Sequence, residues 1–422
     1  MSTPPLWRTF HSRIGDHVLV VQGSQILDIP HDFNTTEPDP RSLAPFVSYG
    51  RLLGLDRVPD VAPQGISLNV TSACNLGCSY CYADRGGFSG RQHGQMSRAT
   101  AESAVEELLA HCERGAIATV GFLGGEPFLN RTLIHHVVGY AARRAAQLGQ
   151  PIGFSATTNG TRLSAKDHAL IRSQRFALTV SIDGDRSVHN LLRRNLLNHG
   201  SFDATMAGVA PLLSEPGSAS VTARATVTGE HLQLTDRYDA LIAQGFTRVG
   251  FSPVRIGFGA LGDEQWPIWT RESITLAERE LQLLLRGADS GYDNFVTALR
   301  RLHAGSASPF PCGAGGGYAS VSTDGRWYAC HRAIGDSAYA LGAGPTTAVD
   351  PRRQQAFLRS HHVDRVEPCR SCWARYLCSG GCHQEAAART DASCTAIRDW
   401  LLFCLDAYCT LSAARPEWFG DR

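Results

Sequence analysis

The sequence predicts an α/β protein: a partial (β/α)6 barrel of the TIM type, with an N-terminal β-hairpin head and a cysteine-rich C-terminal domain. Between residues 62 and 255, short apolar runs alternate with amphipathic helical patterns, as in successive βα units. Before them, two β-like runs flank a turn signal at residues 22–24. Twelve of the 13 cysteines lie at residues 74–81 and from residue 312 onward, which indicates metal binding in two places.

We expect the chain of 422 residues to divide into a head (1–61), a barrel (62–255), a helical linker (256–305) and the cysteine-rich domain (306–422). A formal net charge of +1 gives no electrostatic basis for a nucleic-acid or anionic membrane partner. No apolar run is long enough to span a bilayer. The N-terminus lacks the basic and apolar segments of a signal peptide, so we expect a cytoplasmic protein.

The head is expected to form a hairpin from residues 17–21 and 25–29. A polar, proline-containing stretch (30–45) and a short possible helix ending at residue 55 follow. One interpretation is a hairpin that only packs on the core. The other is a peptide-docking element, in which a ligand strand adds to a sheet edge.

In the barrel, the apolar runs predict strands at 66–70, 118–122, 152–157, 177–182, 220–227 and 248–252. Helical patterns lie near residues 98–112, 131–147, 165–173, 203–213 and 234–244. In barrels of this kind, chemistry takes place at the carboxyl ends of the strands. The loops that follow these strands should therefore surround one site.

The loop after the first strand contains Cys74, Cys78 and Cys81 in CxxxCxxC spacing. Three thiolates this close can hold three irons of a [4Fe–4S] cube and leave the fourth iron without a protein ligand. Ligation by four cysteines is the common closed case, so this loop suggests a cluster kept open for a substrate or cosubstrate. The alternatives are a structural zinc loop, which usually has CxxC pairs and a nearby fourth ligand, or plain core cysteines.

Three further strand ends carry residues suited to a ligand. The second strand runs into a Gly-Gly-Glu-Pro motif at 124–127, where the glycines let backbone approach a ligand and Glu126 can accept an ammonium group. The third ends in Asn159-Gly, and the fourth in a Ser-Ile-Asp-Gly motif at 181–184. Arg193 follows as a candidate for a carboxylate. Each motif alone is an ordinary turn, but together they predict a ligand cavity facing the Cys loop.

The CxxxCxxC, Gly-Gly-Glu-Pro and Ser-x-Asp-Gly motifs together resemble those of radical S-adenosylmethionine (SAM) enzymes, over about half of the sequence. The resemblance implies that Cys74, Cys78 and Cys81 bind a [4Fe–4S] cluster whose free iron chelates SAM. It also implies cleavage of SAM to methionine and a 5′-deoxyadenosyl radical, with a flavodoxin- or ferredoxin-type reductant as electron donor. The residues it assigns to SAM are Tyr80, Gly124, Gly125, Glu126, Asn159, Ser181, Asp183, Arg193 and Val254.

In the linker, residues 269–286 and 293–303 predict amphipathic helices with a packing role. Residues 319–322 and 326–329 flank a Thr-Asp-Gly turn and predict a β-hairpin. Cys404 and Cys409 lie in an apolar helical pattern, and Cys112 ends an amphipathic one. We expect all three to be buried thiols.

The tail pattern GxxxxC…CxxCxxxxxCxxxC…C resembles the SPASM extension of radical SAM enzymes, which carries auxiliary [4Fe–4S] clusters. The resemblance implies three clusters in total. One auxiliary cluster would be held by Cys369, Cys372, Cys378 and Cys394, and the other by Cys312, Cys330 and Cys382. Zinc ribbons are an alternative because of the CxxC pair, whereas a reducing compartment disfavours disulfides.

Two positions depart from this pattern. Some SPASM members have another cysteine several residues after the first, but here that stretch is 313–318, without cysteine. The second auxiliary cluster would then have three Cys ligands and an open iron. Sulfatase-maturing relatives have an Asp after the GxxxxC cysteine, where this protein has His331. Cys-His-Arg resembles the maturases of ribosomal peptides instead, and His331 is a candidate general base, or a residue that only hydrogen-bonds near the cluster.

The sequence therefore predicts a SPASM-type maturase that acts on a ribosomally made precursor peptide. We expect the 5′-deoxyadenosyl radical to abstract a hydrogen from a side-chain carbon, and a carbon–carbon (cyclophane-type) crosslink between side chains to form. A thioether, an epimerised residue or a simple oxidation fits the same residues. The alternatives are a sulfatase-type formylglycine maturase and, from another class, a non-catalytic Fe–S electron carrier.

Overall fold

The computed structural model describes residues 4–29, 41, 43–45, 47–48, 57–58, 61–87, 94–305, 308–344 and 348–420. The expected proline-containing stretch and the short helix ending at residue 55 fall largely outside these residues.

Six parallel strands form the centre of the molecule, in sequence order. They are β4 (Gly65–Thr71), β5 (Ala118–Gly124), β6 (Ile152–Thr158), β7 (Phe176–Ser181), β8 (Ser220–Val227) and β9 (Val249–Pro253). Every strand lies within two residues of its predicted bounds. The predicted partial (β/α)6 barrel is confirmed.

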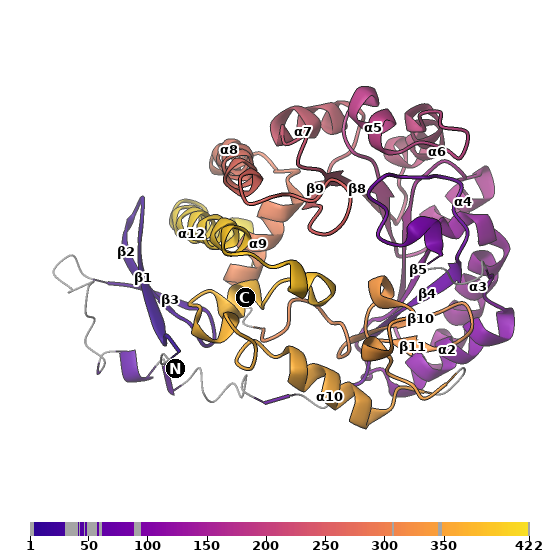
Figure 1. Ribbon diagram of the computed structural model, residues 1–422, viewed down its shortest axis with the longest axis horizontal. Helices are drawn as coiled ribbons and strands as arrows, with labels where there is room; N and C mark the ends of the chain where they lie inside the picture. The colour runs from indigo at the N-terminus through magenta and orange to yellow at the C-terminus, as the bar shows by residue number, and fades with distance from the viewer. Residues whose placement is uncertain are drawn as a thin grey trace.

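Helices cover the outer face of this sheet (Figure 1). They are α2 (Arg98–His111), α3 (Arg131–Leu148), α4 (Ala165–Ser173), α5 (Arg186–Leu192), α6 (Phe202–Ser214) and α7 (Leu234–Ala243). Local signals set their ends: Ser97 caps α2, and Ser164 forms a capping box with Asp167 at the start of α4. The short helix α5 was not predicted. It begins at the cap Asp185, directly after the Ser-Ile-Asp-Gly motif.

Aromatic side chains pack in the core between three of the strands. Phe122, Phe154 and Phe176 stack with ring centroids 6.3–6.5 Å apart. All three side chains are buried, and each such ring pair adds roughly 0.5–1.5 kcal/mol beyond the area it buries. This core fixes the strands whose carboxyl ends carry the predicted site.

The C-terminal hairpin extends the sheet of the barrel. As predicted, β10 (Tyr318–Val321) pairs antiparallel with β11 (Trp327–Tyr328). In addition, β10 pairs in parallel with β4, with Tyr318 opposite Gly65. The hairpin thus brings Cys330 beside the strand that leads into the Cys loop. One continuous sheet crosses the proposed division at residue 306, and the four domain boundaries stay predictions.

The head forms a three-stranded antiparallel sheet of β1 (Trp7–Ser12), β2 (Gly15–Val20) and β3 (Gln25–Asp28). The β2–β3 hairpin was predicted and β1 was not. The sheet lies beside α12 (Asp391–Ala414), which also packs on α8 (Gln265–Leu285) and α9 (Asp293–His303) (Figure 1). Arg13 fastens it there, since its backbone N–H donates to Asp406 over 2.8 Å and its guanidinium pairs with Glu278 over 2.6 Å.

The tail beyond the hairpin contains α10 (Pro351–His361) and α11 (Arg375–Cys378) before α12. The predicted linker helices correspond to α8 and α9. Cys112, Cys404 and Cys409 are buried, as expected. Within the described ranges, no helix combines the length and the apolar composition that crossing a bilayer requires.

Candidate functional site

The Cys loop is held against the end of β5 by the Gly-Gly-Glu-Pro motif. The backbone N–H of Gly125 donates to the carbonyl of Thr71 over 3.0 Å, and that of Glu126 to the carbonyl of Ala73 over 2.9 Å. A Cβ atom on Gly125 would lie 2.3 Å from the carbonyl oxygen of Ala73 and 2.9 Å from the Cβ of Cys74. Only glycine permits this contact between backbones.

Replacing Gly125 by alanine should therefore displace the Cys loop. We expect the G125A protein to lose about four irons per molecule relative to wild type, counting four per cube, because the added methyl group pushes against Ala73 and Cys74. Iron analysis after anaerobic reconstitution measures this loss. The matched control is Gly139→Ala in the middle of α3, where the nearest atom is the flexible end of Arg143 and alanine favours the helix. Unchanged iron in G125A would contradict the assigned role of this glycine.

The other side of the Cys loop rests on the segment after α5 and on the end of β6. The N–H of Gly77 donates to the carbonyl of Arg194 over 2.7 Å. Asn159 donates from Nδ2 to Asn75 Oδ1 over 3.0 Å, and Asn75 donates to Thr161 Oγ1 over 2.8 Å. The Asn159 side chain therefore positions the Cys loop, and sequence reasoning had missed its partners Asn75 and Thr161.

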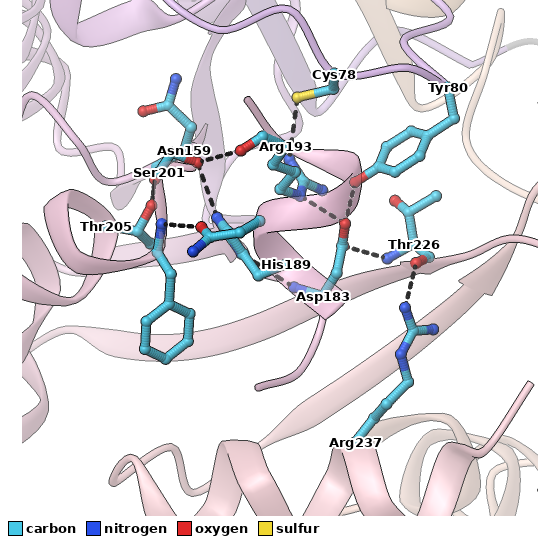
Figure 2. A network of polar contacts seen from close by, with 12 residues as sticks. Cys78, Tyr80, Asn159, Asp183, His189, Arg193, Ser201, Thr205, Thr226 and Arg237 are labelled. Carbon is cyan, nitrogen blue, oxygen red and sulfur yellow. Dashed lines mark hydrogen bonds and ion pairs between the residues drawn. The ribbon is translucent and has the colours of Figure 1, made fainter. Parts of the chain in front are cut away.

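Tyr80 and Arg193 converge on the carboxylate of Asp183 (Figure 2). Arg193 Nε lies 2.9 Å from Asp183 Oδ2, and the Tyr80 hydroxyl donates to the same oxygen. The backbone N–H of Thr226 donates to Oδ1 over 2.9 Å. Asp183 has no exposed surface, and its carboxylate orients Tyr80 and Arg193. The expected direct contact of Asp183 with SAM stays a prediction.

Arg193 lies between the Cys loop and this carboxylate. Its Nη1 is 3.9 Å from Cys78 Sγ, and its guanidinium carbon is 5.3 Å from the centre of the Tyr80 ring. Burial alone would raise the pKa of Asp183, but the charge of Arg193 and the hydrogen bonds from Tyr80 and Arg193 bring it below its usual range. The pair is ionised at neutral pH. The guanidinium thus reaches from Asp183 to the Cys loop.

Ser201 and His189 support the backbone of Arg193 (Figure 2). The hydroxyl of Ser201 donates to the Arg193 carbonyl over 2.7 Å, and it lies 2.9 Å from Nε2 of His189. Burial, with the charge of Arg193, lowers the pKa of His189 to about 4, so this imidazole is neutral. No sequence signal had singled out His189 or Ser201, because both act through a hydrogen bond to backbone.

The carboxylate of Glu126 also turns inward. Its two oxygens accept from the Thr158 hydroxyl over 2.6 Å, from the Asn159 N–H over 2.7 Å and from the Phe128 N–H over 3.1 Å. Burial raises the pKa of this carboxyl to about 7, although these hydrogen bonds oppose the shift. Because the side chain has no exposed surface, it ties β5 to the end of β6. The expectation that it accepts an ammonium group stays a prediction.

The remaining residues assigned to SAM lie at strand ends around the same mouth. Ser181 is half-buried at the end of β7, and its side chain makes no hydrogen bond with the other residues that the structure describes. Val254 follows β9 and is buried, with its N–H donating to Val227 over 2.9 Å. Gly124, with a φ of 149°, packs against the carbonyl of Thr71.

The three sulfurs of the Cys loop fit a cluster better than a zinc ion. Burial raises the pKa of the Cys74 thiol to about 12, and the charges of Glu126, Cys78 and Cys81 add to the shift, so a bound cation is needed to hold it as thiolate. Nowhere in the described residues do three His, Cys, Asp or Glu side chains converge as one metal ion requires. A cubane binds each cysteine through a different iron and spreads its ligands further than tetrahedral zinc does.

The tail brings one predicted set of four cysteines together. Cys369, Cys372, Cys378 and Cys394 line one cavity, together with Arg255, Arg389 and Arg398. Burial raises the pKa of Cys378 to about 11, and the other three cysteines contribute to the shift. Four thiols around a cavity with cationic neighbours fit a cluster of net negative charge.

The second predicted set, Cys312, Cys330 and Cys382, is more exposed to solvent than the first. Cys330 interacts with Cys382 and Cys312, while Cys312 itself is exposed and lines a cavity of about 690 Å³ beside the glycine run at 313–317. Tyr318 ends that run. Its hydroxyl lies 3.0 Å from Nδ1 of His331 and 2.5 Å from Oγ of Ser67 on β4.

His331 faces the barrel from the SPASM-like side. Its ring centre is 6.1 Å from that of Tyr82, which directly follows Cys81 and is half exposed. Burial, with the charge of Arg332, lowers the pKa of His331 to about 4. A neutral imidazole with so low a pKa is a weak proton acceptor at neutral pH, and one ring nitrogen is occupied by Tyr318. The geometry therefore favours the hydrogen-bonding interpretation of His331 over the general base.

Residues 68–212 match the sequence profile of the Radical SAM superfamily. An uncharacterized protein of Methanocaldococcus jannaschii is 29% identical over 44% of this sequence, and the match spans 60% of that protein. The mycofactocin maturase MftC of Mycolicibacterium smegmatis is 26% identical, over 82% of each protein. A serine-type anaerobic sulfatase-maturating enzyme of Klebsiella aerogenes is 25% identical, over 75% of this sequence and 78% of that enzyme.

Two solved structures share the fold. Native anSMEcpe with bound AdoMet superposes with a TM-score of 0.69 at 19% identity, over 83% of this protein and 99% of that one. Streptococcus suis SuiB bound to precursor peptide SuiA superposes with a TM-score of 0.50 at 12% identity, over 93% of this protein and 98% of that one. Most of this fold thus recurs in other solved proteins.

Proposed function

Since this protein is a radical SAM enzyme with a SPASM-type C-terminal region, we propose that it is a maturase that modifies a ribosomally made precursor peptide. Two of its relatives are named as maturases, and the SuiB structure holds a precursor peptide. When bound, SAM and its [4Fe–4S] cluster supply the 5′-deoxyadenosyl radical for hydrogen abstraction. The protein supplies the geometry and keeps water out.

In this proposal, each of the residues around the Cys loop has a separate role in binding the cluster or SAM. Cys74, Cys78 and Cys81 hold the cluster, and Arg193 offers its free nitrogens to the SAM carboxylate. Asp183 and Tyr80 keep that guanidinium in place, and the Gly124–Gly125 backbone meets the methionyl end. Ser181 and Val254 are the proposed contacts for the polar and adenine parts of SAM.

The observation that carries the peptide proposal is the meeting of two loops across the mouth of the barrel. Tyr82, next to Cys81, stands opposite His331 and Arg332, next to Cys330. Tyr82 is half exposed, so its ring is open to solvent where the two loops meet. A substrate side chain lying there is close both to the site of hydrogen abstraction and to the proposed auxiliary cluster.

We further propose that the product is a carbon–carbon crosslink of cyclophane type between two side chains, with two auxiliary [4Fe–4S] clusters in the tail. A crosslink removes two hydrogen atoms from the peptide: the 5′-deoxyadenosyl radical would take one, and the other would leave as a proton while its electron passes to an auxiliary cluster. Coexpression of this enzyme with a short peptide encoded beside its gene, followed by tandem mass spectrometry, tests the bond. The crosslink is supported by a peptide that is lighter by two hydrogens and gives no backbone fragments between the two linked residues. Epimerisation without a mass change, or a thioether, would exclude it.

A formylglycine maturase is the second candidate, because the sulfatase-maturating enzyme of Klebsiella aerogenes matches 75% of this sequence. His331 stands against it, since the resemblance places an aspartate there as proton acceptor in that group. Incubating the reduced enzyme with SAM and a sulfatase peptide separates the two. Conversion of the peptide to formylglycine would replace the crosslinking proposal.

A further inference from the structure

Arg332 bridges the two loops that meet at the barrel mouth; the sequence pointed to it only as the last residue of the Cys-His-Arg motif, without a role. Its backbone N–H donates to Cys330 Sγ over 3.4 Å, and its Nη1 donates to Cys382 Sγ over 3.6 Å. On the other side, its guanidinium carbon lies 4.9 Å from the centre of the Tyr82 ring. One residue thus touches two of the three cysteines of the open set and the residue that follows Cys81.

The guanidinium is held in place by an ion-pair triad. Arg332 Nη1 lies 2.6 Å from Glu385 Oε1, and the second oxygen of Glu385 lies 3.5 Å from Nε of Arg255. Arg255 comes from the barrel, just after β9, and its guanidinium carbon is 4.5 Å from the centre of the Trp266 ring. Two arginines share one carboxylate, so a net positive charge remains fixed beside the cysteine sulfurs.

One N–H donor of the Arg332 guanidinium has no hydrogen-bond acceptor in the described structure. Its Nε atom is buried and has no hydrogen-bond partner among the described residues. A buried N–H without a partner is costly, so such a group usually faces something that binds there. The same guanidinium already donates to Cys382, and the sulfurs of a cluster on Cys312, Cys330 and Cys382 would be acceptors for the remaining N–H.

We infer that Arg332 tunes the auxiliary cluster on Cys312, Cys330 and Cys382, raising its reduction potential through its fixed charge and its N–H···S contacts. The inference rests on the proposed function for the existence of that cluster. Reduction adds one electron and makes the cluster more negative. A cation and N–H donors at the sulfurs therefore stabilise the reduced form, as net charge and hydrogen bonds do in Fe–S proteins generally. Glu385 has the opposite sign and partly offsets Arg332.

The test is a potentiometric titration followed by EPR. It uses the full-length protein with Cys74, Cys78 and Cys81 replaced by alanine, so that only auxiliary clusters give signals. We call the cluster on Cys312, Cys330 and Cys382 the inner cluster. In this background, Arg332→Gln should lower its reduced-to-oxidised ratio at least tenfold at a given potential. For a one-electron couple, this corresponds to a fall of about 59 mV in its reduction potential. The cluster on Cys369, Cys372, Cys378 and Cys394 should keep its potential, since Arg332 contacts none of these cysteines in the described structure.

Two variants separate tuning from a structural role. Arg332→Lys keeps the charge and should shift the potential less than Arg332→Gln. Glu385→Gln removes a negative charge and should move the potential in the opposite direction, which loss of folding cannot produce. Iron content is measured in each sample, with about eight irons per molecule expected for two cubes.

Two results would overturn the inference in distinguishable ways. About eight irons with an inner-cluster potential that Arg332→Gln and Glu385→Gln leave unchanged would exclude tuning by Arg332 and leave the proposed function intact. About four irons in the background protein, with an EPR signal that Arg332→Gln leaves unchanged, would mean that the cluster on Cys312, Cys330 and Cys382 does not exist, which removes that cluster from the proposed function as well.

Discussion

Replacing Cys74, Cys78 and Cys81 by alanine is expected to abolish SAM cleavage while the tail keeps its iron. Anaerobically reconstituted wild-type protein, given dithionite and SAM, should release 5′-deoxyadenosine, and the triple variant should release none. Its iron content should fall by about four per molecule, counting four irons per cube. The physical reason is that, in the proposed assignment, the three cysteines of one loop are the whole protein ligand set of that cluster, whereas the tail cysteines lie on other elements.

The matched control is Cys112→Ala. This cysteine is buried at the end of α2, where its thiol donates to Gln64 over 2.9 Å and accepts from Gln150 over 3.5 Å. The control should keep both its iron and its SAM cleavage. Release of 5′-deoxyadenosine by the triple variant would refute the placement of the SAM cluster, and loss of all iron would show that the tail cannot assemble clusters alone.

Arg193→Ala is expected to destabilise the protein by about 3–5 kcal/mol, because it leaves the carboxylate of Asp183 buried and unpaired. The side chains of this pair are 8% and 0% exposed, so water cannot replace the lost guanidinium. Thermal unfolding of the reconstituted enzyme measures the loss. Arg186→Ala is the control: it breaks the ion pair with Asp203, whose side chains are 60% and 68% exposed, and should cost at most about 1 kcal/mol.

A double variant separates stability from binding. In Arg193→Met/Asp183→Asn, neither partner is charged, so much of the lost stability should return. SAM affinity, measured by equilibrium dialysis, should stay low, because no guanidinium is left for the carboxylate of SAM. If the double variant binds SAM as wild type does, Arg193 is a structural residue and not a ligand-binding one.

Local patterns were enough to predict the barrel and the positions of the candidate ligands. The spacing of Cys74, Cys78 and Cys81 is a property of one loop, and the strand ends are marked by glycines directly after apolar runs. The direction of a side chain is not local. Glu126 stands at a strand end as expected, but donors from Thr158 on β6 and from Asn159 just after it, together with the nearby Phe128 N–H, turn its carboxylate inward.

Contacts between distant segments were beyond prediction from a single sequence. Strand β1 alternates weakly, and only its pairing with β2 identifies it. Glu385 looks like an ordinary acidic residue until the fold places it between Arg255 and Arg332. The parallel pairing of β10 with β4 joins residues about 250 positions apart, for which no periodicity in either segment gives a signal.

That pairing has a consequence for how the protein is made. Strand β4 is the first strand of an open barrel, and its free edge would expose backbone N–H and C=O groups to other molecules until β10 covers it. During synthesis, β10 leaves the ribosome only after the whole barrel has emerged. The nascent barrel therefore passes through a stage with an unprotected edge next to three unligated cysteines, in which it is most open to aggregation and oxidation. Protection of the β4 edge and of the neighbouring Cys loop thus depends on the last quarter of the sequence, which supplies the strand that covers this edge.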